Sequence, residues 1–167
     1  MSSARASAER CVVEWLSDAE VEHDVGARPG EFVVQLPGER KLRTTVSLLV
    51  GDHSLSASAF VVRNPDENHA TVHRWLLERN TRLRGVSFAI DRLGDVYLVG
   101  RIPLAGVTPE TVDALMGELL DTSDGTFNEL LAKGFLTAMR KEWAWRISRG
   151  ESTRNLDAFR HLLDPPP

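Results

Sequence analysis

Three short apolar segments separated by turn signals lie between residues 32 and 62, and they constrain the fold more than any other feature. Phe32–Leu36 is rich in β-forming residues, and Pro37-Gly38 separates it from Leu42–Val50. Gly51-Asp52 then precedes Leu55–Val62. Turns this short join antiparallel neighbours, so the pattern predicts a three-stranded meander. Alternation places one set of side chains of the second segment on a shared face: Leu42, Thr44, Val46 and Leu48.

Helical patterns flank this meander. Ala4–Leu16 carries apolar side chains at helical spacing. The run Asn64-Pro65-Asp66-Glu67 combines an N-cap residue, a proline suited to the first helical position and acids in the first turn. It predicts a helix that starts there and continues to about Arg79. Asn80 is predicted to end this helix, because asparagine tolerates the left-handed conformation.

A second hairpin and a long helical region follow. Val86, Phe88 and Ile90 alternate as a strand, a turn lies at Leu93-Gly94-Asp95, and Val96–Ile102 returns as the next strand. Thr108-Pro109-Glu110 predicts another helix start, and the helical pattern extends to about Arg149. We expect a break in it at Ser123-Asp124-Gly125.

The resulting order is α-βββ-α-ββ-α, with extra C-terminal helices that include a short one at Ser152–Leu163. An antiparallel sheet packed by helices on one side satisfies this order, so the predicted fold class is α+β. The 167 residues fit a single domain, which we place at 1–163. Residues 164–167 end in three prolines, which neither helix nor sheet interiors accept, and are predicted to be a disordered tail.

Composition argues against several classes of protein. The formal net charge of −4 disfavours a general binder of nucleic acids or anionic membranes, because both need a basic surface. The single cysteine, Cys11, rules out an internal disulfide and a cysteine-based zinc site. No segment approaches the roughly 20 apolar residues of a membrane span, and the N-terminus lacks an apolar signal region. The sequence therefore predicts a cytoplasmic protein without membrane contact.

Two arrangements of residues could carry chemistry, and neither is complete. His69 and His73 share a helical face, but a metal site would need a third ligand, and the position after His69 is alanine rather than the glutamate of metalloproteases. Asp91 and Asp95 could act as paired carboxylates, but they bracket a tight turn, where aspartate commonly bonds the backbone. No nucleophile accompanies them. We therefore predict no enzyme activity, no catalytic residues, no cofactor and no metal.

The most unusual stretch is Glu142-Trp143-Ala144-Trp145-Arg146, near the end of the long helical region. Trp143 and Trp145 lie about 200° apart around a helix axis, so both cannot lie squarely on one buried face. Either one tryptophan is exposed, or the chain's last helix covers both edges. Tryptophan and arginine are the residue types most enriched at interface hot spots. The candidate partner-binding residues are accordingly Trp143, Trp145, Arg146 and Arg149.

Several of these motifs together resemble a known family. The run Arg74-Trp75-Leu76-Leu77-x-x-Asn80 precedes Val86-x-Phe88-x-x-Asp91-x-x-Gly94-Asp95-x-Tyr97-Leu98-Val99-Gly100-Arg101, and this combination resembles the YbjN-domain family. The C-terminal part resembles the actinobacterial branch of this family. The residues that carry this resemblance are Glu142-Trp143-x-Trp145-Arg146-x-x-Arg149-Gly150, with Asn155, Leu156 and Phe159. The resemblance implies a fold like that of type III secretion chaperones, which often dimerise and grip an extended segment of a partner. It also implies a role in sensory transduction or stress regulation, without enzyme activity.

These inferences lead to two functional hypotheses. The first is a non-enzymatic protein-binding regulator or chaperone-like adaptor, a homodimer that binds a protein or peptide segment. The alternative is a nucleic-acid or nucleotide-responsive regulator that uses the stretch from Arg140 to Arg160. This stretch contains six basic and three acidic residues. Because the net charge is negative, nucleic acid is the less favoured partner.

Overall fold

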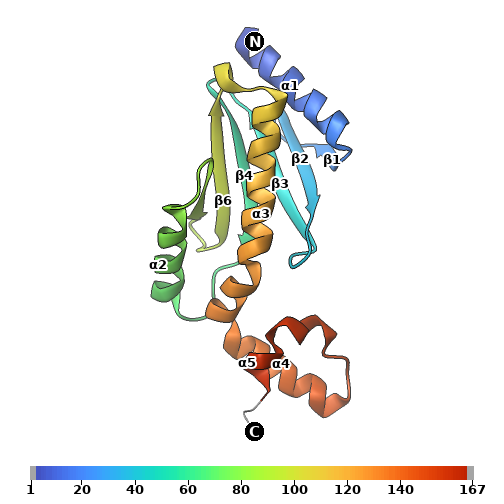
Figure 1. The fold of residues 1–167 in the computed structure, drawn as a ribbon, viewed down its shortest axis with the longest axis vertical. Helices are drawn as coiled ribbons and strands as arrows, with labels where there is room; N and C mark the ends of the chain where they lie inside the picture. The colour runs from blue at the N-terminus through green and yellow to red at the C-terminus, as the bar shows by residue number, and fades with distance from the viewer. Residues whose placement is uncertain (1–2, 165–167) are drawn as a thin grey trace.

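The computed structural model describes residues 3–164, which form a six-stranded antiparallel sheet with helices before, between and after its strands (Figure 1). The helices are α1 (Ser3–Ala19), α2 (His69–Asn80), α3 (Pro109–Gly134), α4 (Leu136–Arg149) and α5 (Arg160–Leu163), with short 3-10 helices η1 (Leu104–Gly106) and η2 (Arg154–Phe159). The strands are β1 (Glu22–Val25), β2 (Glu31–Pro37), β3 (Arg43–Val50), β4 (Ser54–Val62), β5 (Val86–Ile90) and β6 (Val96–Pro103).

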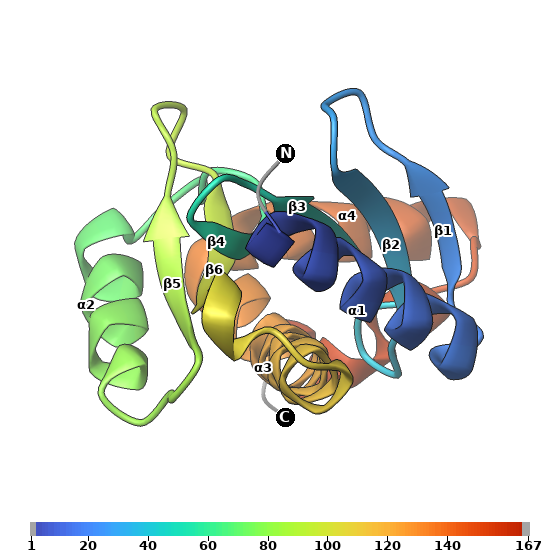
Figure 2. The ribbon, with the colours of Figure 1, turned by 90° about the horizontal axis from the view of Figure 1, so that it is seen from above.

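The sheet has the strand order β1-β2-β3-β4-β6-β5, and every neighbouring pair is antiparallel. Helices α1 and α3 pack on one face of the sheet, and α2 lies beside β5 at one end of it (Figures 1 and 2). Helices α4 and α5 lie at the opposite end of the long axis from α1 (Figure 1). The α+β class and the predicted antiparallel sheet are confirmed.

The main core fills the space between the sheet and helices α1 and α3. Alternate residues of β3, including Val46 and Leu48, are fully buried and face Val12 of α1 and Met116 and Leu119 of α3 within one cluster. Each such side chain stabilises the fold by about 1.5–3 kcal/mol relative to an exposed position. A second, smaller core joins α4 to η2 and α5 and contains Met139, Trp143, Leu156, Phe159 and Leu163.

The sequence did not predict β1. All four of its residues are exposed, so the strand has no apolar alternation. It is held by backbone pairing with β2 and by an exposed ion pair between Glu22 and Arg43 (3.8 Å). Leu42 was also misplaced: it precedes β3 and is 85% exposed, rather than sharing the buried face of Thr44 and Val46.

The helix start predicted at Asn64 is wrong, because α2 begins at His69. The backbone N–H of Asn64 donates to Asp95 (2.7 Å) and its side-chain amide donates to the carbonyl of Leu93 (2.9 Å), so these groups are engaged by a distant hairpin. The residue before α2, Asn68, has a left-handed φ of 57° and provides no side-chain cap. A sequence that reads as a helix start therefore forms a connecting loop.

Helix α2 ends at Asn80 as predicted, but for a different reason. Its C-cap residue, Thr81, is right-handed (φ −65°). The Asn80 side chain instead accepts a hydrogen bond from the N–H of Phe88 (2.7 Å) and donates one to the carbonyl of Phe88 (3.2 Å). Asn80 thus ties the end of α2 to the outer edge of β5.

Helix α3 runs unbroken from Pro109 to Gly134, so the break predicted at Ser123–Gly125 is wrong. Ser123 is fully buried, and its hydroxyl lies 3.2 Å from that of Thr44 on β3. The predicted start is confirmed, because Thr108 caps the helix by accepting from the N–H of Thr111. The break comes instead at Phe135 (φ −137°), between α3 and α4.

The predicted tail lies almost wholly outside the described residues, which end at Asp164. None of the helices within residues 3–164 is long and apolar enough to cross a membrane.

One carboxylate is largely buried at the start of β2. Glu31 is 8% exposed and accepts hydrogen bonds from the guanidinium of Arg28 (2.7 Å) and the hydroxyl of Ser47 (2.6 Å). Bonds from the Arg28 side chain, followed by those from Ser47 and from the Arg28 backbone, lower the pKa of Glu31 to about 2.

We expect this carboxylate to make stability depend on pH. Because its pKa is lower in the folded chain than the ordinary value of 4.5, its ionised form stabilises the fold above about pH 4.5. That contribution is lost as the pH falls from about 4.5 towards 2. Urea midpoints of the wild type and Glu31→Gln, measured from pH 7 to pH 2.5, should show a smaller loss in the variant. Equal slopes below about pH 4.5 would contradict this role.

Candidate partner-binding site

The two tryptophans of α4 have opposite environments. Trp143 is 8% exposed and belongs to the C-terminal core, where Leu156 and Phe159 of η2 and Leu163 of α5 cover it. Trp145 is 48% exposed. Of the two alternatives left open by the sequence, the last helical segment therefore covers one tryptophan and leaves the other in solvent.

The two candidate arginines also differ. Arg146 donates to the carboxylate of Glu142 (2.9 Å) and to the carbonyl of Ser152 (3.0 Å), so it holds the turn that follows α4. Glu142 also accepts from Asn155, and bonds from Arg146 and then Asn155 lower the pKa of Glu142. The guanidinium of Arg149, in contrast, lies over the Trp145 ring at 5.8 Å. The structure thus brings Trp145 and Arg149 together on the surface.

Lys141 lies one turn before Trp145 and is exposed as well. Residues Lys141, Trp145 and Arg149 are spaced by four, so they follow one another along the outer side of α4. We call these three residues the basic–aromatic ridge. Within residues 3–164, neither cation of the ridge has a carboxylate within 4.0 Å.

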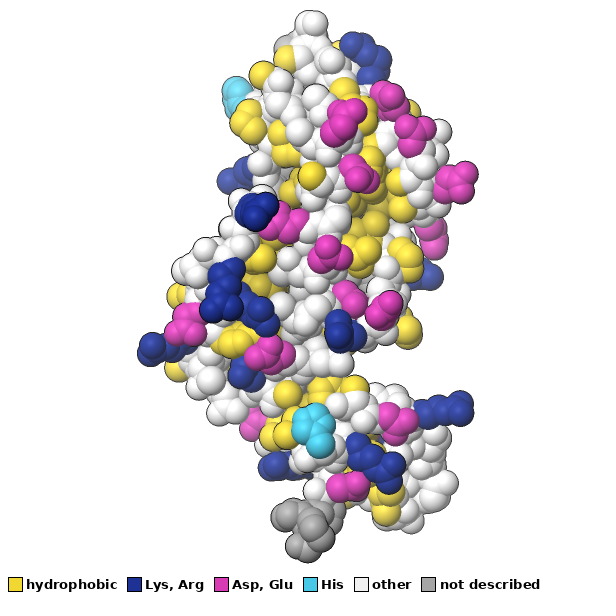
Figure 3. All heavy atoms as spheres, viewed as in Figure 1, with side chains coloured by type: hydrophobic (Ala, Val, Ile, Leu, Met, Phe, Trp, Pro, Cys, Tyr) yellow, Lys and Arg dark blue, Asp and Glu magenta, His cyan; other side chains and the backbone are white. Residues whose placement is uncertain are grey.

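An apolar groove of about 530 Å³ lies where the C-terminal helices meet the rest of the molecule. Figure 3 shows the C-terminal helices as a distinct lower body, with hydrophobic side chains gathered where it meets the upper one. The end of β4, the second half of α3, α4 and η2 form the walls. Prominent apolar lining residues are Phe60, Val62, Phe127, Leu131, Phe135, Met139, Leu156 and Phe159.

Lys41 stands at the edge of this groove. It donates to the carbonyl of Phe60 (2.7 Å), and its ammonium lies 5.8 Å from the centre of the Phe60 ring. Burial lowers the pKa of Lys41, because its charge is partly removed from water. Phe60 itself is 39% exposed. The groove therefore combines accessible apolar surface with a partly desolvated cation.

The groove and the ridge are continuous along α4. Ala138 and Glu142 line the groove, and Trp145 and Arg149 follow them at intervals that keep all four on one side of a helix (i, i+4, i+7, i+11). Seven residues of helix separate Ala138 from Trp145, a rise of about 10 Å. A bound segment could contact both features at once.

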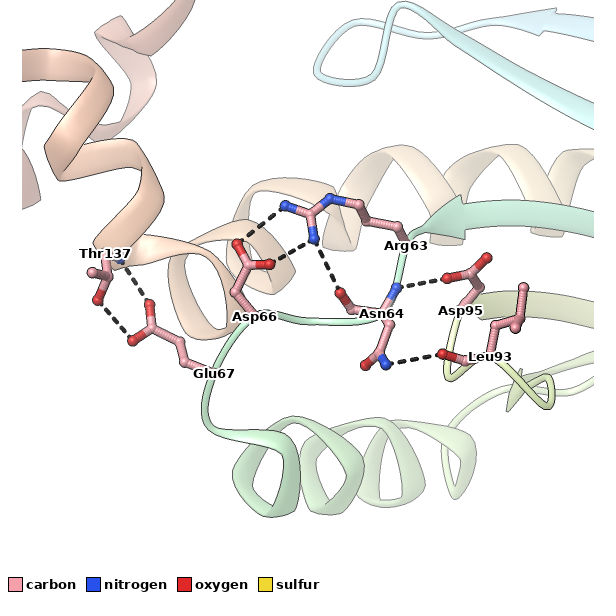
Figure 4. Close-up of polar contacts among 7 residues, drawn as sticks. All are labelled: Arg63, Asn64, Asp66, Glu67, Leu93, Asp95 and Thr137. Atoms are coloured by element: carbon pink, nitrogen blue, oxygen red, sulfur yellow. Dashed lines mark hydrogen bonds and ion pairs between the residues drawn. The ribbon is translucent and has the colours of Figure 1, made fainter. Parts of the chain in front are cut away.

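The loop Arg63–Asn68 fixes the position of α4 relative to the sheet (Figure 4). The carboxylate of Glu67 accepts from the N–H of Thr137 (2.7 Å) and from its hydroxyl (2.8 Å). These bonds lower the pKa of Glu67, which lies at the N-terminal end of α4, where a negative charge is favourable. The carbonyl of Gly134 accepts from the N–H of Asp66 (2.9 Å). The loop thus holds both sides of the break between α3 and α4.

Arg63 links this loop to the groove. Its guanidinium pairs with Asp66 at 2.6 Å (Figure 4). It also lies 4.6 Å from the centre of the Phe135 ring, which lines the groove. The hydrogen bond to Asp66, aided by the charge of that carboxylate, raises the pKa of Arg63. The charge of Arg63 is therefore already paired within the chain.

The two aspartates considered for acid–base chemistry hold a hairpin. Asp91 accepts from the N–H groups of Leu93 (2.8 Å) and Asp95 (3.0 Å), and Gly94 between them has a φ of 83°. Asp95 accepts from the N–H of Asn64. Both carboxylates thus bond backbone groups, as turn aspartates do.

The two histidines lie side by side, with ring centres 6.2 Å apart. Within residues 3–164, no group of three or more histidine, cysteine, aspartate or glutamate side chains is arranged to hold a metal ion.

A family model described as YbjN, "Putative bacterial sensory transduction regulator", matches residues 11–132. The chain belongs to the YbjN family. Protein ML2442 of Mycobacterium leprae is 53% identical over 133 residues, covering 80% of this chain and 72% of its own. Protein Mb0497 of Mycobacterium bovis is 44% identical over 166 residues, covering 97% and 91%. The mycobacterial likeness thus includes the C-terminal helices, which lie beyond the family model.

Three solved structures share the fold. The HopA1–SchA chaperone–effector complex matches with a TM-score of 0.57 at 12% identity, covering 77% of this chain and 98% of the other. The Yersinia pestis type III secretion chaperone SycH, in complex with a fragment of YscM2, gives 0.52 at 13%, covering 70% and 96%. YbjN from E. coli gives 0.55 at 16%, covering 74% and 91%. The predicted YbjN membership and chaperone-like fold are confirmed.

The groove was not predicted from the sequence. One signal for it was available: β4 places Ser54, Ser56 and Ser58 on its outer face and then Phe60 at the next outward position. A phenylalanine that continues a row of serines on a solvent-facing side indicates a covered or binding surface.

Proposed function

We propose that this YbjN-family chain is a non-enzymatic, cytoplasmic protein-binding adaptor, whose partner binds across the groove and the basic–aromatic ridge. The observation that carries the proposal is the exposed Trp145, one turn along α4 from Glu142, which lines an open apolar groove. Tryptophan and arginine dominate interface hot spots, and an apolar groove is suited to an inserted side chain. The fold supports a protein partner, because similar chains occur in a chaperone–effector complex and in a complex with a fragment of YscM2.

The proposal assigns different roles to the four residues predicted from the sequence. Trp145 and Arg149 would contact the partner directly. Trp143 and Arg146 would support them from within, since Trp143 fills the C-terminal core and Arg146 bonds Glu142. The homodimer predicted from the family resemblance remains a prediction.

A nucleic-acid partner is the second candidate, and the ridge is the observation that favours it. Aromatic side chains flanked by cations bind single strands by stacking and charge. The net charge of −4 opposes this, and the mostly apolar lining of the groove favours an apolar side chain over a phosphate backbone.

Affinity capture from the native cytosol tests the proposal. Wild-type protein is compared with Trp145→Ala and with Leu77→Ala, an equally simple truncation of an exposed residue on α2. We expect a partner that wild type and Leu77→Ala retain and Trp145→Ala loses by tenfold or more, which corresponds to at least about 1.4 kcal/mol. If the wild type and both variants retain the same partners equally, the proposed surface is wrong.

A further inference from the structure

We propose that the segment bound at this surface is acidic and carries one bulky apolar side chain that enters the groove. This inference rests on the proposed function and adds the chemistry of the partner.

The charge around the groove favours an anionic segment. Acids next to groove residues are already paired: Glu142 with Arg146 at 2.9 Å, Asp66 with Arg63 at 2.6 Å and Asp124 with Arg40 at 3.9 Å. Within residues 3–164, the side-chain ammonium of Lys41 has no carboxylate within 4.0 Å, although its backbone N–H donates to Asp124 (2.9 Å), and neither cation of the ridge has one. The surface therefore presents unpaired positive charge, although the whole chain is negative.

Lys41 gives the strongest argument, because its charge is partly buried. A partly desolvated ammonium gains more from an incoming carboxylate than an exposed one does, since water screens the pair less. A carboxylate placed at the Phe60 end of the groove would supply that partner. Its binding would raise the pKa of Lys41, which burial now lowers.

The apolar anchor follows from the shape and lining of the groove. Its volume of about 530 Å³ lies within the range of roughly 300–1,000 Å³ of pockets that hold compact ligands. Four phenyl rings line it: Phe60 from β4, Phe127 from α3, Phe135 at the α3–α4 break and Phe159 from η2. Such a lining suits a leucine or an aromatic side chain, with a preference for edge-to-face ring contacts.

Helix geometry limits the spacing between anchor and acids. From Ala138, at the groove, to Arg149 the helix rises about 16 Å, and an extended segment covers about 3.3 Å per residue. Residues of the segment that reach Trp145 and Arg149 would therefore lie about three to five positions from the apolar anchor, where a carboxylate could pair with Arg149 beside the Trp145 ring. On the other side of the anchor, an adjacent acid would reach Lys41.

Two other occupants are physically reasonable and give different results. A single-stranded nucleic acid would use the ridge through stacking and phosphate contacts. A second copy of this chain could present α1, whose outer side combines Glu9, Val13 and Glu14, with Val13 50% exposed. The test below separates both from an acidic partner segment.

The experiment pans a displayed library of random 12-residue peptides on the immobilised full chain and measures the selected peptides in solution. The expected peptides are rich in aspartate and glutamate, with a leucine or aromatic residue about three to five positions from an acid. Synthetic versions should lose at least tenfold in affinity with Trp145→Ala and also with the double variant Lys141→Gln, Arg149→Gln. Leu77→Ala should bind like the wild type. Binding should weaken as salt is raised.

Several results would overturn the inference. These are selected peptides that are basic or uncharged, no enrichment at all, or equal binding to the wild type and to Trp145→Ala. A 20-nucleotide oligothymidine that binds more tightly than the peptides, and requires Trp145, would assign the surface to nucleic acid. Self-association in light scattering that Trp145→Ala abolishes would assign it to a second copy.

The experiments distinguish failure of the acidic-segment inference from failure of the proposed adaptor function. A captured partner that depends on Trp145, together with basic selected peptides, would preserve the adaptor and reject the acidic segment. The proposed adaptor would instead fail if acidic peptides bound the ridge while no cellular partner depended on Trp145.

Discussion

Replacing Trp143 with alanine is expected to unfold the helices after residue 135 while the sheet remains folded. Truncating a buried tryptophan costs about 3–5 kcal/mol, and here it removes the largest member of a core formed by only five buried residues. Helix α4 has 14 residues and is marginal without tertiary packing. Hydrogen exchange by mass spectrometry should show lost protection over residues 136–163 and retained protection in β3, β4 and β6.

The matched control is Trp145→Ala, which removes the same side chain two residues later. Because Trp145 is 48% exposed, we expect a change in stability within about 0.5 kcal/mol. If Trp143→Ala kept full protection in α4, the C-terminal core would not depend on this side chain, and the assignment of Trp143 to support rather than contact would be wrong.

Replacing Leu119 with alanine is expected to lower the free energy of unfolding of the sheet and the helices packed on it by about 2–5 kcal/mol. Leu119 is fully buried on α3, within the cluster that joins this helix to the sheet and α1. The lost transfer energy and the remaining cavity act together, and the loss is large relative to a typical total of about 5–15 kcal/mol. Urea denaturation followed by far-ultraviolet circular dichroism gives the midpoint and slope.

Leu77→Ala provides the comparison for this variant. Leu77 is 67% exposed on α2, so its truncation should change the free energy by less than about 0.5 kcal/mol. A loss below about 1 kcal/mol for Leu119→Ala would mean that the α3–sheet contact is looser than the packing described above.

The elements that the sequence predicted correctly are those whose own burial pattern specifies them. Alternation in β3 and helical spacing in α1 follow directly from which side chains face the core, such as Val46 and Val12. Strand β1 could not be predicted this way, because its four residues are all exposed and its backbone pairs with β2 without burying a side chain.

Misplaced boundaries arose where distant partners replaced local ones. Asn64 has the chemistry of a helix cap, but Asp95 and Leu93 occupy its hydrogen-bonding groups from another hairpin. The sequence around Ser123 is typical of a helix break. In the folded chain, however, the Ser123 hydroxyl forms a hydrogen bond with the hydroxyl of Thr44 on β3 inside the core. Neither contact has a signature in the local sequence.

The sequence predicted the tryptophans of the candidate site but not the groove beside them. Helical geometry established that Trp143 and Trp145 must differ in environment, but not which of them the last segment covers. The groove combines β4, α3, α4 and η2, so it exists only once these elements pack. Phe60 was its one local sign.

Asn80 has a consequence for how copies of this chain can assemble. A sheet grows into a fibre only if both edges accept new strands, and Asn80 occupies the N–H and C=O of Phe88 in the middle of β5. The other edge, β1, is four residues long and carries Glu22, His23 and Asp24, features that discourage strand addition. Edge-to-edge joining would then stop at a pair. The chain can therefore be concentrated around a partner without polymerising through its sheet.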